Sequence, residues 1–157
     1  MTEVSIPLHF RDLTPADIAT MSWSGSDSHL SHMRMQLTRV AEGKAGYVVA
    51  CPPSDLPIAK CGMDFQTDDG TAVIWQVAVH PALQSLGIGT ALIAYAEERI
   101  RARGIETARL SVEHNNPRAR ILYERLGYVA KYERAESWMT DDGLYETMCT
   151  WMLKPLR

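Results

Sequence analysis

The sequence predicts an α/β fold in which a mixed central sheet of about seven strands is flanked by four helices. Its 157 residues suit a single domain spanning 1–157, long enough to bury most of the unfolded chain's surface in one core. Strand-like and helix-like segments follow in the order strand, two helices, three strands, helix, strand, helix, two strands. Capping residues mark where the helices begin and end. The chain has no repeats or low-complexity segments, so one domain accounts for all of it.

The first half of the chain supplies four of the predicted strands and two helices. Residues 4–10 have the pattern of a strand, and Thr14-Pro15-Ala16-Asp17 has an N-cap, a proline at the first helical position and an acid in the first turn. Apolar residues at helical spacing predict a second helix over 28–42. Turn-forming residues separate three further strands, which we expect at 46–51, 57–65 and 72–80.

The second half has longer helices with clear ends. Residues 88–103 form one apolar face at helical spacing, and Gly104 follows as the terminating glycine. Asn116-Pro117 is an N-cap followed by proline, and it starts a helix that ends at Gly127. We expect the remaining strands at 107–113, 128–136 and 144–153.

Composition excludes several classes of protein. The 16 basic and 19 acidic residues give a net charge of −3, which argues against nucleic acid as the main partner. Apolar stretches are shorter than the roughly 20 residues that span a bilayer, and no secretory signal is visible, so we expect no membrane partner. Three cysteines without CxxC spacing argue against a disulfide framework. A reducing, cytoplasmic compartment is therefore expected.

The most informative segment is the loop that joins the strand at 72–80 to the helix at 88–103. Gly87 and Gly89 open the helix, where the first N–H groups lack partners and the helix dipole favours an anion such as a phosphate. A tight structural turn is the alternative interpretation. A dinucleotide fingerprint is excluded because Leu92 stands where a third small residue is required. A Walker A loop is excluded because it requires a lysine that this segment lacks.

Two motifs resemble those of the GNAT family of acetyl-CoA-dependent N-acetyltransferases. Gln84-x-x-Gly87-x-Gly89 is similar to the family signature, and the segment from Asn116 to Tyr128 is similar to its Asn-x-x-Ala-x-x-Leu-Tyr-x-x-x-Gly-Phe motif. The element order also matches, so the resemblance covers essentially the whole chain. It implies a sheet that is splayed between the fourth and fifth strands, acetyl-CoA as co-substrate and no metal.

The resemblance also implies which residues hold coenzyme A. Backbone N–H groups of the loop would bind the pyrophosphate, and the backbone near Val77 and Val79 would pair with the pantetheine arm. Asn116 caps its helix and would also contact pantetheine, while Gln84 and Arg118 would contact the outer phosphates. The residues of the pyrophosphate loop are Leu86, Gly87, Ile88, Gly89 and Thr90.

Two side chains are the leading catalytic candidates. In similar proteins the tyrosine at the position of Tyr123 protonates the leaving thiolate, although the residues alone also fit a core aromatic. A lysine-like amine costs about 4.6 kcal/mol to deprotonate at pH 7, and an α-amine only about 1.4 kcal/mol. Glu113 is the leading general base, ahead of His80 and His114, and transfer of the proton through water is the alternative.

The acceptor and the assembly are less determined. The resemblance implies an acceptor pocket formed by residues 21–36 and 137–146, for a small-molecule amine, a peptide or protein N-terminus, or a lysine. A catalytically silent acyl-CoA-binding or sensor module is the alternative function, and a protein-interaction domain on the same fold is a third. His29-x-x-His32 has helical metal-ligand spacing but no third ligand, so we expect no metal. The apolar last strand suggests a homodimer as a hypothesis.

Overall fold

The computed structural model describes residues 1–157 and contains one seven-stranded sheet in the order β1-β2-β3-β4-β5-β7-β6. The strands are β1 (His9–Asp12), β2 (Ala45–Cys51), β3 (Ala59–Asp64), β4 (Ala72–Val79), β5 (Thr107–Glu113), β6 (Val129–Thr140) and β7 (Gly143–Pro155). The helices are α1 (Pro15–Ile18), α2 (Asp27–Ala41), α3 (Ile88–Ala102) and α4 (Pro117–Arg125). The predicted mixed sheet with four flanking helices is confirmed. None of these helices combines the length and the apolar character needed to cross a bilayer.

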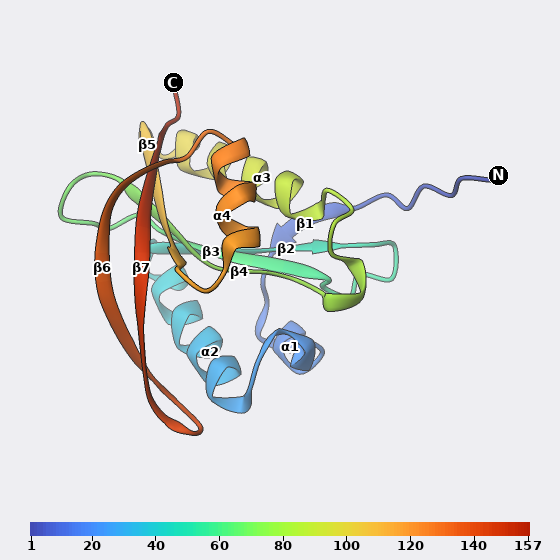
Figure 1. The fold of residues 1–157 in the computed structure, drawn as a ribbon. Coiled ribbons are helices and arrows are strands. Elements are labelled where there is room, and N and C mark those ends of the chain that lie inside the picture. The colour runs from blue at the N-terminus through green and yellow to red at the C-terminus, as the bar shows by residue number, and fades with distance from the viewer.

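Helices cover both faces of the sheet, with α3 and α4 on one face and α1 and α2 on the other (Figure 1). We call these the α3 face and the α2 face. Strand β2 is fully buried, so its alternating side chains enter two separate hydrophobic clusters. Val48 and Ala50 pack with α3, whereas Tyr47 and Val49 pack with α1 and α2. Each face therefore has its own core.

Strand β1 is shorter than the sequence predicted. It begins at His9 rather than at Val4, and ends at Asp12 rather than at residue 10, because its ladder with β2 runs only from His9 opposite Cys51 to Asp12 opposite Val48. The preceding residues have no strand partner, and they run away from the body of the molecule in Figure 1.

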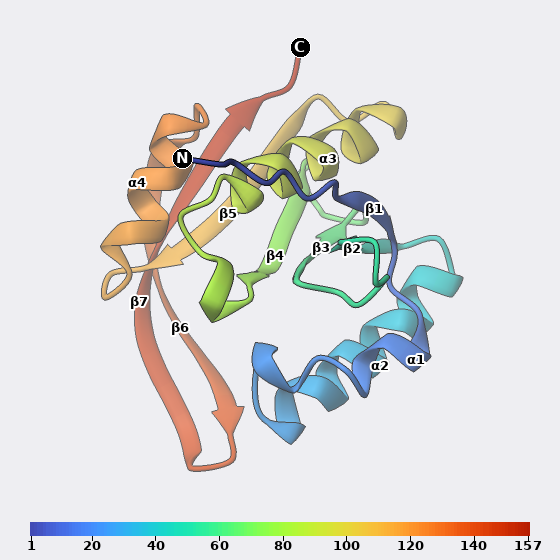
Figure 2. The same ribbon diagram turned by 90° about the vertical axis from the view of Figure 1, so that its right-hand side faces the viewer.

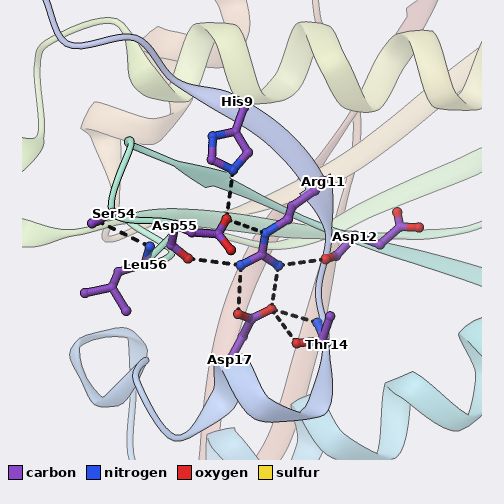
Figure 3. Close-up of polar contacts among 8 residues, drawn as sticks. All are labelled: His9, Arg11, Asp12, Thr14, Asp17, Ser54, Asp55 and Leu56. Carbon is purple, nitrogen blue, oxygen red and sulfur yellow. Dashed lines mark hydrogen bonds and ion pairs between the residues drawn. The ribbon is translucent and has the colours of Figure 1, made fainter.

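An ion-pair network ties β1 to α1 and to the loop after β2 (Figure 3). The Arg11 guanidinium donates to both carboxylate oxygens of Asp17, at 2.7 and 2.9 Å, and its Nε donates to Asp55 Oδ1 at 2.8 Å. The Arg11 hydrogen bond lowers the pKa of Asp17, which also accepts from Thr14 in a capping box. His9, Cys51 and Asp55 lie close enough to bind one cation together. The positively charged Arg11, however, already donates a hydrogen bond to the Asp55 carboxylate. The network is structural.

Strands β4 and β5 separate soon after they begin to pair. Their parallel ladder has only two register pairs, Ala72 with Ala108 and Val73 with Arg109. Further along, β4 has a register shift against β3, and Gln76 adopts a positive φ of 53° there. The expected splay between the fourth and fifth strands is thus confirmed, and it leaves the second half of β4 open toward β5.

The last two strands form a long hairpin that extends beyond the sheet on the side of α2 (Figures 1 and 2). Both strands exceed the predicted ranges of 128–136 and 144–153. Strand β7 pairs with β5 on one side and β6 on the other, so it is an interior strand of the sheet, and the homodimer stays a prediction. At this end of the sheet the edge strand is β6, because β7 lies between β5 and β6.

Candidate active site

A cavity of about 810 Å³ opens between β4, the start of α3 and α4. It forms where β4 leaves β5, so that α3 and α4 are held apart over the exposed end of the strand. Nine of the ten residues predicted to bind coenzyme A line it, together with Tyr123. Those nine are Val77, Val79, Gln84, Gly87, Ile88, Gly89, Thr90, Asn116 and Arg118.

The N-terminus of α3 presents unpaired N–H groups to this cavity. Gly87 is the N-cap with a φ of 85°, a conformation that glycine adopts without strain, and no side chain caps the helix. The helical hydrogen bonds begin with the Ala91 N–H donating to Gly87 O at 3.2 Å. The N–H groups of residues 88–90 are therefore left for a ligand, and the first turn has no acidic side chain. This arrangement favours an anion.

Gly89 lines the cavity without a side chain. A Cβ built on it would lie 3.5 Å from Leu122 and 3.8 Å from Val79, which are ordinary contact distances. Both neighbours line the cavity, so a side chain at this position would fill ligand space rather than collide with the protein. The absence of a side chain at Gly89 therefore leaves its backbone open to the cavity.

Arg118 joins the first turn of α4 to the loop that precedes α3. Its guanidinium donates to Gln84 Oε1 at 3.2 Å and also to the Ser85 hydroxyl. Asn116 Oδ1 accepts from the Ala119 N–H at 3.2 Å, so the predicted N-cap is confirmed. These contacts place a positive charge beside the free N–H groups of α3.

Leu86 is the predicted loop residue whose placement differs from the others. Its side chain is 68% exposed, and the residue does not line the cavity. The loop turns at Ser85 and Gly87, which both have positive φ, and this directs the intervening side chain outward.

Tyr123 brings a hydroxyl group from α4 to the cavity. The residue is only 7% exposed, and burial raises the pKa of its phenol to about 12. Its neighbour Tyr128, 6.2 Å away between ring centroids, donates to Glu97 at 2.8 Å, whereas no protein group pairs with the Tyr123 hydroxyl. The Tyr123 phenol is thus a protonated donor without a protein partner.

Glu113 lies on the α2 face rather than in the cavity. The alternate residues Leu110 and Val112 pack in the cluster with α3, so the period of the strand directs Glu113 to the other face. Its Oε1 accepts from the Tyr145 hydroxyl at 2.7 Å, which brings the β6–β7 hairpin to the end of β5. The cavity and this carboxylate therefore lie on the two sides of the opening between β4 and β5.

The two other candidates for the base have protein partners. His80 Nδ1 accepts from the Ala82 N–H at 3.1 Å, and its ring lies 5.5 Å from that of Trp23. His114 forms an exposed pair with Glu133 at 3.2 Å. Neither residue lines the cavity.

One cluster of polar side chains around Lys60 was not predicted from the sequence. Lys60 is 1% exposed and hydrogen-bonded to His29 and to Tyr47, and Tyr47 in turn donates to Gln76. The only signal for it in the sequence is a lysine between the apolar residues of the segment 58–63, within the strand predicted at 57–65.

The comparisons with known proteins agree with this geometry. The family model described as "Acetyltransferase (GNAT) family" matches residues 13–128, well over half of the chain. The chain belongs to the GNAT acetyltransferase family. The match confirms the predicted family, and it includes the loop before α3 as well as α4.

Individual relatives cover parts of this GNAT chain. A mycothiol acetyltransferase of Beutenbergia cavernae is 43% identical over 61 residues, which are 39% of this chain and 20% of the relative. The ribosomal protein bS18-alanine N-acetyltransferase of Escherichia coli K12 is 35% identical over 72 residues, 46% of this chain and 49% of the relative. The chain thus spans about half or less of the curated relatives it matches. A spermidine/spermine N-acetyltransferase structure from Vibrio cholerae superposes with a TM-score of 0.75 at 18% identity, covering 95% of this chain and 92% of that one.

Proposed function

We propose that this chain is an N-acetyltransferase that transfers the acetyl group of acetyl-CoA to a primary amine. The observation that carries the proposal is the cavity at the start of α3, where three free N–H groups and Arg118 meet the exposed edge of β4. A pyrophosphate suits the helix N-terminus, and an extended pantetheine arm suits a strand edge without a partner strand. The curated relatives carry the names of acetyltransferases, which supports the same activity.

The cofactor contacts follow from this proposal. The N–H groups of Gly87, Ile88, Gly89 and Thr90 hold the pyrophosphate, and the backbone of Val77 and Val79 pairs with pantetheine. A backbone N–H near Val79 would stabilise the oxyanion of the tetrahedral intermediate, a contribution of a few kcal/mol in comparable sites. Gln84, Asn116 and Arg118 border the phosphates and the arm. Leu86 contributes only its backbone, in accord with its exposed side chain.

The amine nitrogen attacks the thioester carbonyl, the C–S bond breaks, and two protons move. We assign Glu113 as the base that takes the proton of the attacking amine, with Tyr145 fixing its carboxylate. We assign Tyr123 as the acid that protonates the departing thiolate, because it lines the cavity and its protonated hydroxyl has no protein partner. The acid and the base would act from opposite faces of the sheet.

The proposal is tested by titrating the protein with acetyl-CoA in a calorimeter and then screening amines for release of thiol. Binding with turnover on an amine would support the enzyme. Binding without turnover across small amines, peptides and lysine-containing substrates would instead favour an acyl-CoA-binding module. Absence of binding would refute the assignment of the cavity.

The acceptor and the compartment are part of the proposal. The relatives are named for acceptors as different as a ribosomal-protein alanine and spermidine, so a primary amine is the common class. The acceptor would enter from the α2 face, where Glu113 lies, between α2 and the β6–β7 hairpin. The free and buried thiols of Cys51, Cys61 and Cys149 support a reducing, cytoplasmic compartment.

A further inference from the structure

A buried chain of hydrogen bonds crosses the α2 face from the first turn of α2 to β4. Lys60 Nζ lies 2.7 Å from His29 Nε2 and donates to the Tyr47 hydroxyl at 3.1 Å. The Tyr47 hydroxyl lies 2.7 Å from Gln76 Oε1 and donates to it. Tyr47 and Lys60 are each 1% exposed, whereas Gln76 is half-buried at the other end of the chain.

Neither hydrogen-bond partner of Lys60 is a carboxylate, which is unusual for a buried lysine. Burial lowers the pKa of Lys60 to about 7. Burial and the nearby Lys60 charge lower the pKa of His29 to about 4, so His29 is neutral at neutral pH and its Nε2 is free to accept. The ring of His29 lies against the backbone of Gly25, where an added Cβ would come within 2.7 Å of it, so the glycine leaves room for the ring.

The donors and acceptors of these groups fix the direction of each hydrogen bond in the series. Below its pKa of about 7 Lys60 is an ammonium with only donors, so it donates to His29 Nε2 and to the Tyr47 oxygen. Tyr47 must then use its single hydrogen for Gln76 Oε1, which accepts it. The carboxamide of Gln76 is thereby fixed with its oxygen toward Tyr47, and its NH₂ group has no protein acceptor.

Gln76 also stands at the point where β4 changes its geometry. It has a φ of 53°, an unusual conformation for a residue other than glycine, at the register shift between β3 and β4. The next residue, Val77, lines the cavity on the α3 face, whereas the Gln76 side chain contacts Tyr47 on the α2 face. The free NH₂ group is therefore one residue from the cavity wall, on the face from which the proposed acceptor enters.

We propose that Lys60 is a positioning residue which, through Tyr47, holds the Gln76 NH₂ group ready to donate a hydrogen bond to an oxygen next to the reacting amine. The preferred acceptor class is then an α-amino carbonyl compound, such as a peptide N-terminus or an amino-acid amide, over a diamine. This inference rests on the proposed function and adds a specificity determinant to it.

Two amines with the same carbon skeleton test the specificity. Alaninamide has a carbonyl oxygen beside its α-amine, whereas 1,2-diaminopropane has a methylene and a second amine there. The kcat/KM values are compared after each KM has been expressed as the concentration of the neutral amine. We expect the wild-type protein to favour alaninamide by at least about tenfold, the value of one hydrogen bond to a buried polar group.

Three variants each remove one group from this series of hydrogen bonds: Lys60→Met, Tyr47→Phe and Gln76→Glu. Gln76→Glu retains an oxygen for Tyr47 but has no NH₂ group. In each variant we expect the preference to fall toward unity, mainly through KM for alaninamide. Acetyl-CoA affinity should be unchanged. Lys44→Met removes an exposed lysine that pairs with Glu42 and should leave the preference as it is.

The outcomes separate this inference from the proposed function. Loss of acetyl-CoA binding by the wild-type protein would refute the function itself. If the wild-type protein binds acetyl-CoA but acetylates neither amine, or does not prefer alaninamide, the specificity is refuted. An equal fall in kcat for both amines in Gln76→Glu would indicate a contact to the thioester oxygen and would also overturn the proposal.

The direction of these hydrogen bonds is tested without any substrate. Nitrogen-15 NMR of histidine side chains reports which ring nitrogen has the hydrogen. Near pH 6, above the pKa of His29 and below that of Lys60, we expect His29 as the neutral Nδ1–H tautomer with Nε2 as acceptor. In Lys60→Met, the Nε2 resonance should shift. An Nε2–H tautomer in the wild-type protein would overturn the assigned direction.

Discussion

The two faces of the sheet are built in different ways. On the α3 face, the free N–H groups that suit an anion are backbone groups of one short segment, residues 88–90 at the start of α3. On the α2 face, the polar groups are side chains from distant segments, such as His29 with Lys60 and Glu113 with Tyr145. The first kind of site is suited to a constant ligand, and the second can differ between relatives that share the fold.

This difference predicts that the effect of a variant depends on the face of the sheet on which the changed residue lies. Apart from the proposed acid Tyr123, changes on the α3 face should affect acetyl-CoA binding, and changes on the α2 face should affect reaction of the amine. A variant that crosses this division would contradict the comparison.

The largest effect is expected from Gly87→Glu. The new carboxylate stands beside the free N–H groups and repels the pyrophosphate, so acetyl-CoA binding should weaken by at least about 100-fold in calorimetry. Gly104→Glu is the matched control, because Gly104 also has a positive φ and open space around its Cβ. Both changes should cost roughly 1–2 kcal/mol in stability. Equal effects on binding would show that the loss at Gly87 is not local.

Glu113→Gln tests the base on the α2 face. Glutamine cannot take a proton, so kcat at pH 7 should fall tenfold or more while the Kd of acetyl-CoA is unchanged. The defect should shrink toward pH 10, where more of the amine is already neutral. Glu133→Gln, an exposed neighbour of His114, is the control. A defect that is constant with pH would argue against Glu113 as base.

Tyr123→Phe should lower kcat by about tenfold through loss of the acid, with little change in acetyl-CoA affinity. Tyr128→Phe in the adjacent ring removes the hydrogen bond to Glu97 and should cost about 1 kcal/mol in stability without lowering kcat more than about twofold. Stopped-flow turnover and thermal melts measure both. If the two variants have the same kcat, Tyr123 has only a packing role.

Arg118→Ala should have a smaller effect. It removes one charge and the contacts to Gln84 and Ser85 at a solvated site, so the Kd of acetyl-CoA should rise about three- to tenfold. The difference from wild type should narrow at high salt, because exposed charges are screened. Arg157→Ala, which breaks an exposed pair with Glu106, is expected to bind as wild type. A salt-independent difference would point to a change in loop structure.

A separate prediction concerns the pH dependence of stability. The pKa of Lys60 is about 7 in the folded protein and about 10.4 in an unfolded chain. Between these values the unfolded chain binds more protons, so this residue makes stability rise with pH above 7. Urea unfolding of wild type and Lys60→Met at several pH values should show a rise that the variant lacks. Parallel curves would mean that Lys60 keeps its charge in the folded state.

The sequence by itself determined the order of the elements, most of their boundaries and the residues around the cavity. These features depend on local rules: the helix at 88–103 and the cap at Asn116 follow from periodicity and capping, and the anion site follows from two glycines at a helix start. Because the backbone makes this site, a short stretch of sequence is enough to predict it.

Only the tertiary structure decided the α2 face and the sheet order at the C-terminus. Nothing local to 144–153 indicates that this strand lies between β5 and β6, and nothing near Gln76 indicates that Tyr47 and Lys60 fix its carboxamide. The hydrogen bonds of these groups join residues 13 to 32 positions apart in the chain. Such contacts depend on how the strands pair, and pairing is set by the packing of the whole sheet rather than by any one segment.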